Sequence, residues 1–298
     1  MTSAALRIRR RATLRARLRD RRVSGWLFLL PLAAINALVV LVPALSSVAY
    51  SLTDWTGLGP ANFIGLDNYA RMFGDPDFLN ALVHNIQWTA FFLVVPMGLG
   101  LFGAYALTRV RRFRLLFRVA FFVPYIVASV VSAAIWRVLL SPDAGLGALF
   151  GVNFLGNPDL ALWSVAFVNN WAWWGFLVVV YLAAMQGVNP SLLEAASLDG
   201  AGEFRKFVSI TLPSIRPTFA FLGLMTIIWS FLAFDYVFIL TQGGPAGSTD
   251  LLSTMLYREA FSNLDAGYAS AIGVVLAGIS ALVVTGYLSL RRARGWEI

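Results

Sequence analysis

Six long apolar stretches, separated by polar segments, dominate the pattern of this chain. They run approximately over residues 26 to 48, 86 to 107, 119 to 140, 161 to 185, 218 to 240 and 268 to 290. A helix needs about 20 residues to cross a hydrocarbon core. In lipid the backbone must form its hydrogen bonds within the segment, because no water is available. The pattern therefore predicts an all-α membrane protein with six transmembrane helices, in a domain over 26–290.

The basic residues predict how these spans are oriented. Lys and Arg number nine in segment 1–25, five in 108–118, three in 186–217 and three after residue 290. The intervening segments 49–85, 141–160 and 241–267 hold one, none and one. Because cytoplasmic loops carry the excess of Lys and Arg, we expect both termini and the 186–217 segment in the cytoplasm.

The two ends of the chain are assigned by the same reasoning. The Arg-rich segment 1–25 is predicted to be a basic cytoplasmic segment that lies against anionic membrane lipid. A nucleic-acid arm is the other interpretation of such a run, and the adjoining apolar span argues against nucleic acid as a partner. Residues 291–298 are expected to form a cytoplasmic tail.

Composition places the chain outside the soluble class. Of 298 residues, 59% are hydrophobic and 13% are charged, against roughly 25% charged in soluble domains. The absence of cysteine excludes disulfides and a thiolate metal site within this sequence. With His84 as the single histidine, no metal site is predicted.

The third outer segment, 241–267, opens with Thr241, Gln242, Gly243, Gly244 and Pro245. Two glycines allow a sharp turn, and the proline prevents immediate helix continuation. The apolar residues that follow are spaced to share one face of a short helix: Leu251, Leu252, Met255 and Leu256. The opening is either a functional loop or simply the exit from the fifth span.

A helical hairpin is predicted in the cytoplasmic loop, about 188–217. Asn189 can cap a helix that begins at Pro190, and Gly200 can end it in a left-handed conformation. The first helix, 190–199, contains Glu194. A second helix is predicted from residues that share one face: Phe204, Phe207, Val208, Thr211 and Leu212. Spacing alone leaves two roles open, a docking element for a soluble partner and an amphipathic connector.

The same loop carries a motif, Glu194-Ala195-Ala196, followed by Asp199-Gly200 and then by Ile210, Leu212 and Pro213. It matches the EAA signature of ABC importer permeases, and the chain resembles the carbohydrate-type, MalF-like subunits from about residue 26 onward. Further matching stretches are 122–125, 135–137, 234–236 and 241–245. The last of these, continued to Thr249, is typical of MalF-like rather than MalG-like subunits.

The resemblance implies a type I ABC importer permease fold in the bacterial cytoplasmic (inner) membrane. The implied partners are a second, MalG-like permease, two copies of a cytoplasmic ATPase and an extracytoplasmic solute-binding protein. Glu194, Ala195, Ala196, Asp199 and Gly200 would then couple this chain to the ATPase. ATP and Mg would be used by that partner, and no G-x-x-x-x-G-K-[ST] phosphate loop occurs in this sequence. The chain is thus expected to bind no cofactor and to be no enzyme.

Substrate-path residues are sought among polar groups within the spans. Asp235 is the only acid inside a span, and intramembrane ionisable groups are functional candidates. A structural role, with a hydroxyl or Arg137 as its partner, is the alternative. For a neutral sugar, the candidates that offer hydrogen bonds and aromatic faces are Asn169, Asn170, Trp171 and Tyr236. Thr241, Gly243, Gly244 and Pro245 are the candidate periplasmic gate loop.

Two other classes remain as alternatives. A stand-alone ion-coupled carrier needs intramembrane coupling groups and usually repeated halves, and only Arg137 and Asp235 are available. An integral membrane enzyme needs converging acids or metal ligands, and the outer acids lie among turn residues without a motif. We therefore predict a permease subunit that forms, with a second permease, the path for a sugar.

Overall fold

The computed structural model describes residues 21–110 and 112–293, which are helical for most of their length. The predicted segment 1–25 and tail 291–298 lie largely outside this range. The long helices are α5 (Pro76–Arg109), α6 (Arg114–Ile126), α7 (Ser129–Leu139), α9 (Pro158–Gln186), α13 (Arg216–Phe231) and α16 (Ala266–Ala293). In the described part, extended structure is confined to one isolated bridge, Thr53 with Phe63.

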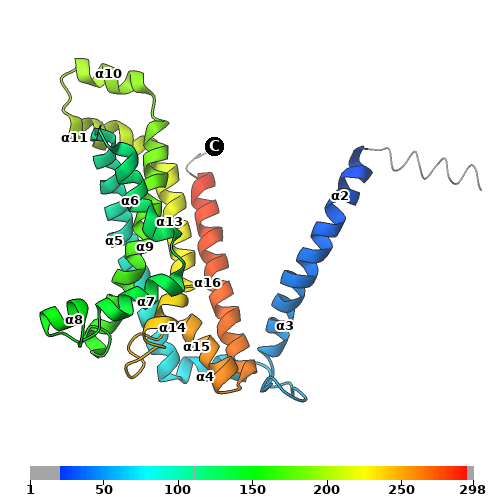
Figure 1. The fold of residues 1–298 in the computed structure, drawn as a ribbon. Coiled ribbons are helices and arrows are strands. Elements are labelled where there is room, and N and C mark those ends of the chain that lie inside the picture. The colour runs from blue at the N-terminus through cyan, green and yellow to red at the C-terminus, as the bar shows by residue number, and fades with distance from the viewer. Residues whose placement is uncertain (1–20, 111, 294–298) are drawn as a thin grey trace, which may run out of the picture.

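The first span joins three helical segments, α2 (Arg21–Asn36), the π-helical η1 (Ala37–Leu41) and α3 (Val42–Tyr50). It is apolar enough to span a membrane over Phe28–Tyr50, yet none of that window is buried within the chain. Only the end of this span approaches the rest of the molecule, where α3 packs beside α16 (Figure 1). Its apolar surface therefore requires cover from outside the chain.

Within the described residues, five segments are long and apolar enough to cross a membrane, and a bent pair of helices makes a sixth candidate. The predicted helix 119–140 is not continuous, because α6 and α7 meet at an angle of 96°. Val127 and Ala128 have extended backbone at the break. A uniformly apolar sequence hides such a break, since hydropathy measures transfer to lipid and not backbone direction. The predicted fifth span is likewise divided, into α13 and α14 (Asp235–Leu240).

The second span begins ten residues earlier than predicted. Asp75 caps α5 by accepting a hydrogen bond from the Asp77 backbone N–H at 2.9 Å, and Pro76 occupies the first helical position. These residues look like turn formers in sequence, but they also make up a favourable helix start. The outer segment before α5 contains α4 (Asp67–Gly74), and the following outer segment contains α8 (Gly145–Phe150).

The two ends of the bundle carry different elements (Figure 1). One end holds α10 (Pro190–Leu198), α11 (Glu203–Lys206), the end of α16 and the start of α2. The opposite end holds α4, α8, α14 and α15 (Leu252–Tyr257). The apolar helix predicted after Leu251 is thus confirmed as α15. This arrangement agrees with the orientation predicted from the basic residues.

Glycine allows α9 to pack very closely against two other helices. A Cβ at Gly175 would lie 1.8 Å from the backbone oxygen of Phe121 in α6. A Cβ at Gly100 of α5 would lie 2.6 Å from the Cβ of Leu177. Small residues permit this approach between membrane helices. The buried core accordingly lies along α9, around Leu177, Val178 and Tyr181.

Gly175→Ala is expected to destabilise the protein, because the added Cβ would clash with the Phe121 backbone. Backbone atoms, unlike a side chain, cannot relieve a clash by changing rotamer. Overpacking of this kind costs about 1–3 kcal/mol, which should lower Tm of the purified protein in detergent. Gly98→Ala on α5 is the matched control, since a Cβ there meets nothing within 4 Å. Equal unfolding temperatures for the two variants would contradict the close α6–α9 contact.

Candidate functional site

A pocket lies between α5, α9 and α13, near the middle of these spans. This central pocket has a volume of about 140 Å³ and is lined by Trp88, Phe92, Asn169, Trp173, Thr226, Trp229, Ser230 and Ala233. Trp173 and Trp229 meet edge to face with ring centroids 4.3 Å apart. Trp88 and Phe92 stack at 5.2 Å. Half of the lining is therefore aromatic.

Unpaired polar atoms accompany these rings. The Trp173 Nε1 and Thr226 Oγ1 atoms are buried and have no hydrogen-bond partner within the described chain. A buried polar group left unpaired costs free energy that a ligand with hydroxyls can recover. The lining residues carry no ionisable side chain. The central pocket thus suits a neutral ligand with both hydrogen-bonding groups and apolar faces.

The structure brings one of the five predicted substrate-path residues into this pocket. Asn169 lines it, whereas Asn170 is buried nearby with its Oδ1 unpaired. Trp171 points elsewhere, and its ring meets Trp136 of α7 at 5.7 Å. Tyr236 is buried outside the lining set. These three assignments stay predictions that the pocket geometry does not favour.

Sequence reasoning missed most of the pocket. Trp88, Phe92 and Trp229 come from helices far apart in sequence, and their apolar character is that of any membrane span. Thr226 and Ser230 lie one helical turn apart on α13, and such a pair of hydroxyl residues is a weak signal. The Ser230 hydroxyl donates to the Thr226 backbone oxygen at 2.7 Å, so its hydrogen bond is already made within α13.

The structure gives Asp235 a hydroxyl as its partner, one of the two partners considered from the sequence. The Ser129 hydroxyl donates to Asp235 Oδ2 at 2.7 Å, while Arg137 donates to the Ile239 backbone oxygen. Ser129 begins α7 and Asp235 begins α14. Each of these residues follows a break in its span, so the two contacts join the outer halves of both broken spans.

The predicted gate loop is ordered by its own hydrogen bonds. The Thr241 and Thr249 hydroxyls lie 2.8 Å apart, and Thr249 also donates to the Gly244 oxygen at 2.8 Å. Gly243 has φ +88, and a Cβ there would lie 2.9 Å from Asp250 Oδ1. The Gly244–Pro245 peptide is cis. The loop is thus held beside Asp250, which is ion-paired with Arg258.

An outer polar pocket of about 420 Å³ lies next to this loop. It is lined by Asp77, Asn80, His84, Ala246, Gly247, Ser248, Asp250 and Arg258. His84 Nδ1 lies 3.1 Å from the Asp250 backbone oxygen, so the single histidine joins α5 to the loop. No group of metal-ligating residues is present in the described chain.

The predicted cytoplasmic hairpin is confirmed at its start. Asn189 Oδ1 accepts a hydrogen bond from the Ser191 backbone N–H at 3.0 Å, and Pro190 begins α10. Gly200 has φ +75, the left-handed conformation expected after a helix end. The second helix is less regular than predicted, because α11 passes into the π-helical η2 (Phe207–Thr211).

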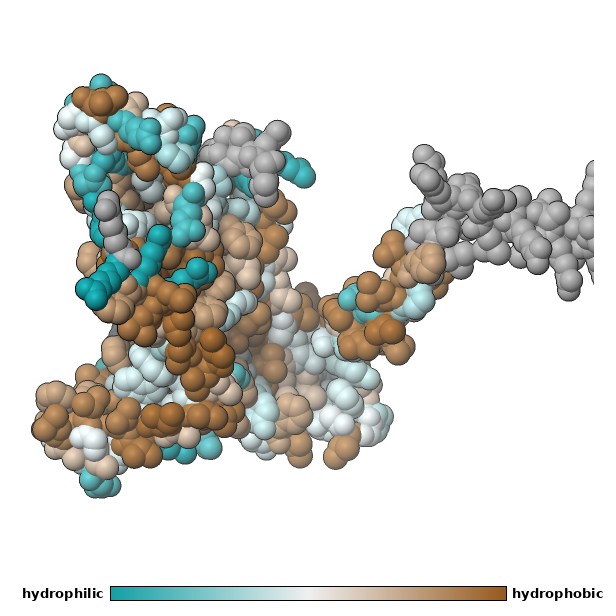
Figure 2. Space-filling view, turned by 45° about the horizontal axis from the view of Figure 1, so that its top comes forward, coloured by the Kyte–Doolittle hydropathy of each residue, from teal (hydrophilic) through white to brown (hydrophobic). Residues whose placement is uncertain are grey.

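The hairpin presents its motif to solvent. Glu194 and Ala195 are exposed and Ala196 is half-buried, while Asp199 and Gly200 are exposed. Leu198 is 90% exposed and Phe204 is 73% exposed. Exposed apolar side chains at the water-facing end of a membrane protein are typical of a docking surface. Figure 2 shows this end as mostly hydrophilic, with few hydrophobic residues, above a predominantly hydrophobic bundle face.

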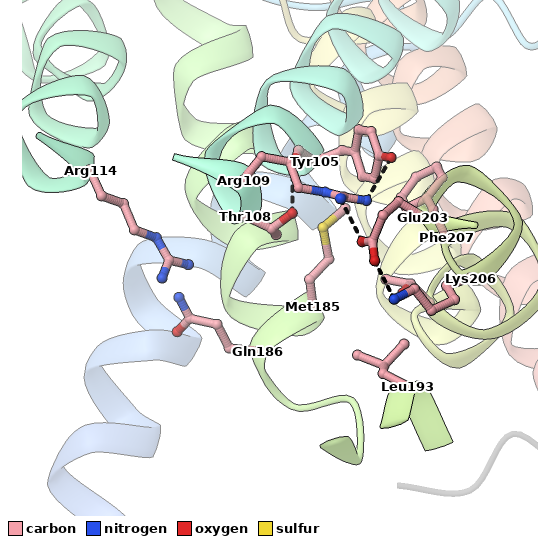
Figure 3. A pocket seen from close by; sticks show the side chains of 11 residues that line it. Tyr105, Thr108, Arg109, Arg114, Met185, Gln186, Leu193, Glu203, Lys206 and Phe207 are labelled. Carbon is pink, nitrogen blue, oxygen red and sulfur yellow. Dashed lines mark hydrogen bonds and ion pairs between the residues drawn. The ribbon is translucent and has the colours of Figure 1, made fainter. Parts of the chain in front are cut away.

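A cytoplasmic pocket of about 330 Å³ lies beneath the hairpin, between the ends of α5 and α9 and the start of α6. Figure 3 shows Glu203 within it between Arg109 and Lys206. The hydrogen bond from Lys206 and the charge of Arg109 hold the pKa of Glu203 below its usual value. Its charge is therefore lost only as pH falls through that lowered pKa, and the ion pairs persist at neutral pH.

These features are those of a multi-pass membrane protein with a partly aromatic pocket amid its spans and an exposed hairpin at its cytoplasmic end. Residues 96–294 match the model of the family described as binding-protein-dependent transport system inner membrane component. The chain belongs to this family, and it is a multi-pass component of an ABC transporter. Its assignment as a non-catalytic transport subunit is thereby confirmed.

Two relatives align over nearly the whole chain. The probable ABC transporter permease protein YurN of Bacillus subtilis is 34% identical over 92% of this chain and 96% of its own length. The diacetylchitobiose uptake system permease protein NgcF of Streptomyces coelicolor is 36% identical over 88% of this chain and 80% of its own length.

A solved structure matches the fold. A chain of the bacterial alginate ABC transporter, crystallised in complex with an alginate pentasaccharide-bound periplasmic protein, superposes with a TM-score of 0.82. It is 23% identical, and the match covers 92% of this chain and 96% of that one. The predicted type I importer fold is confirmed by this likeness.

Asp235→Ala is expected to lower Tm in detergent, because it removes the acceptor of the Ser129 hydroxyl, a contact worth about 0.5–1.5 kcal/mol. Asp235→Asn keeps an acceptor oxygen and should retain wild-type Tm and transport. Loss of transport in the Asn variant at unchanged Tm would contradict the structural role. It would assign the carboxylate charge to the substrate path.

Proposed function

We propose that the central pocket is part of the path of a sugar through the membrane. The observation that carries this proposal is the combination of aromatic faces with the unpaired Trp173 Nε1 and Thr226 Oγ1 atoms. A sugar offers hydroxyls to such atoms and C–H surfaces to the rings. The names of two relatives agree, since one is a diacetylchitobiose uptake system permease protein and the other a probable starch degradation products transport system permease protein.

The proposed partner proteins follow from the surfaces that this chain leaves exposed. The first span has no buried residue in its apolar window, which supports a second, MalG-like permease packed beside this one. The exposed hairpin with Glu194, Ala195 and Ala196 supports docking on a cytoplasmic ATPase, present in two copies, that uses ATP and Mg. A solute-binding protein delivers the sugar at the opposite end, near the loop of Thr241, Gly243, Gly244 and Pro245.

Coupling is proposed to proceed through rigid-body movement of the hairpin. When the ATPase copies close on ATP, α10 tilts and carries the attached spans between inward-open and outward-open states. The Glu194 carboxylate is exposed on α10, where it can pair with a cation of the ATPase. Asp199 and Gly200 end the helix and set the direction of the chain toward α11.

Trp229→Ala is expected to reduce uptake by the reconstituted complex about fivefold to tenfold at low sugar concentration. The estimate follows from the loss of one aromatic contact, about 1–1.5 kcal/mol. Trp163→Ala on α9 is the matched control, because Trp163 is 44% exposed, close to the 39% of Trp229, and lies outside the pocket. Equal effects of the two variants would remove the central pocket from the sugar path.

Glu194→Lys is expected to leave the chain in the membrane and to abolish ATP hydrolysis stimulated by sugar and binding protein. The reason is that a reversed charge opposes the docking contact. Asp143→Lys in the exposed loop before α8 is a matched charge reversal at the other end, and it should keep the stimulation. The measurement is phosphate release by purified complex in lipid, and normal stimulation in Glu194→Lys would contradict a coupling role.

A further inference from the structure

We infer that a chain of polar contacts from α5 to α10 makes the second span the direct recipient of hairpin movement. This cytoplasmic strut consists of Arg109, Glu203, Lys206 and Ser197. The inference rests on the proposed coupling function of the hairpin and adds the route by which its movement reaches the spans.

The strut begins at the last residue of α5. Arg109 Nη1 lies 2.5 Å from Glu203 Oε2. The same guanidinium donates from Nη2 to the Tyr105 hydroxyl at 2.8 Å and lies 4.9 Å from the centroid of the Tyr105 ring. Tyr105 is one turn earlier on α5, so Arg109 is fixed in direction before it reaches the hairpin. Its planar group with several donors suits such a fixed position.

The strut continues through α11 to α10. Glu203 Oε1 is ion-paired with Lys206, one turn along α11. Lys206 Nζ in turn donates to the Ser197 hydroxyl at 2.9 Å, and Ser197 is one residue beyond the Glu194-Ala195-Ala196 motif on α10. Two helices of the hairpin are therefore linked to a span by three consecutive contacts (Figure 3 shows the part from Arg109 to Lys206).

Apart from its chain connections to α9 and α13, the hairpin makes few direct contacts with α5. No residue of α10 is buried, so apolar packing does not fix it to the bundle. The ring of Phe207, in η2, meets Tyr105 with centroids 4.4 Å apart. The strut and this aromatic contact thus converge on one turn of α5. That helix also lines the central pocket, through Trp88 and Phe92 near the middle of the span.

The expected sizes of the effects distinguish a coupling role of the strut from a stabilising role. The Glu203 side chain is 57% exposed and that of Arg109 38%, and ion pairs with such exposure add little to stability. Truncating the strut should therefore hardly change Tm. Coupling between distant sites, by contrast, commonly changes a response fivefold or more, so the strut should be visible in coupling and not in unfolding.

The test is a double-mutant cycle in the complete reconstituted complex, with sugar transported per ATP hydrolysed as the readout. Arg109→Gln and Glu203→Gln should each lower this ratio roughly fivefold or more. The double variant should be no worse than either single one, because both remove the same link. Losses that multiply in the double variant, or wild-type ratios in both single variants, would overturn the inference.

Arg114→Gln is the matched control. Arg114 lines the same cytoplasmic pocket and is in no ion pair within the described chain, so its removal changes the local charge without cutting the strut. This variant should keep the wild-type ratio. A loss equal to that in Arg109→Gln would assign the effect to the charge of the pocket and overturn the strut.

A distance measurement tests the same inference without transport. The chain has no cysteine, so spin labels can be placed at Leu192→Cys on α10 and Phe102→Cys on α5. Both sites are exposed. ATP should leave this distance unchanged in the otherwise wild-type complex and alter it in the Glu203→Gln background. The same ATP-dependent change in both backgrounds would overturn the inference.

Glu194→Lys, assayed in parallel, separates failure of the strut from failure of the proposed coupling function. Normal stimulation of ATP hydrolysis in that variant would reject the hairpin as the coupling element, and the strut with it. If stimulation is lost in Glu194→Lys while Glu203→Gln keeps the wild-type ratio, only the strut is rejected.

Discussion

The close contact of α9 with α5 and α6 is the packing on which the other features depend. Gly175 lies against the Phe121 backbone, and Gly100 and Gly103 lie against Leu177 and Val178. Membrane helices gain no hydrophobic free energy by leaving lipid for one another, so close van der Waals contact between small residues must replace it. With α9 fixed in this way, Asn169 and Trp173 face the central pocket, and the hairpin begins at a defined point.

Two breaks in the spans impose a second constraint. Backbone that leaves the helix inside a membrane must still pair its polar groups. The structure meets this need near α14 with side chains, because Ser253 donates to the Ala233 oxygen and Arg137 to the Ile239 oxygen. Asn85 adds a bridge, donating to the Ser230 oxygen and accepting from the Leu252 backbone N–H. Polar residues in these spans therefore serve the backbone first, and only the unpaired ones remain for a ligand.

The sequence predicted those features that depend on transfer to lipid or on local capping. Five spans, their orientation, the Asn189 cap and the turn at Gly200 all follow from residues close together in the chain. The break at Val127 and Ala128 does not, because the stretch is apolar throughout and Pro124 fits within α6. The central pocket could not be predicted from the sequence either, because only packing brings Trp88, Trp173 and Trp229 together. Asp235 is a further case, because the sequence could not show that the Ser129 hydroxyl donates to it, and its place in the substrate path stays a prediction.

The distribution of burial connects these observations. The core follows α9 and its neighbours, a second cluster joins α4, α15 and α16 at the outer end, and the first span contributes to neither. The chain thus buries its middle and leaves one span and one hairpin exposed to lipid, water or other proteins. The apolar first span can be covered by lipid or protein, because both are equally apolar. The hairpin lies in water, where exposed Leu198 and Phe204 gain free energy only by docking on a protein. The hydrophobic effect thus favours association of the water-exposed hairpin with a protein, whereas contacts between the spans depend on close packing.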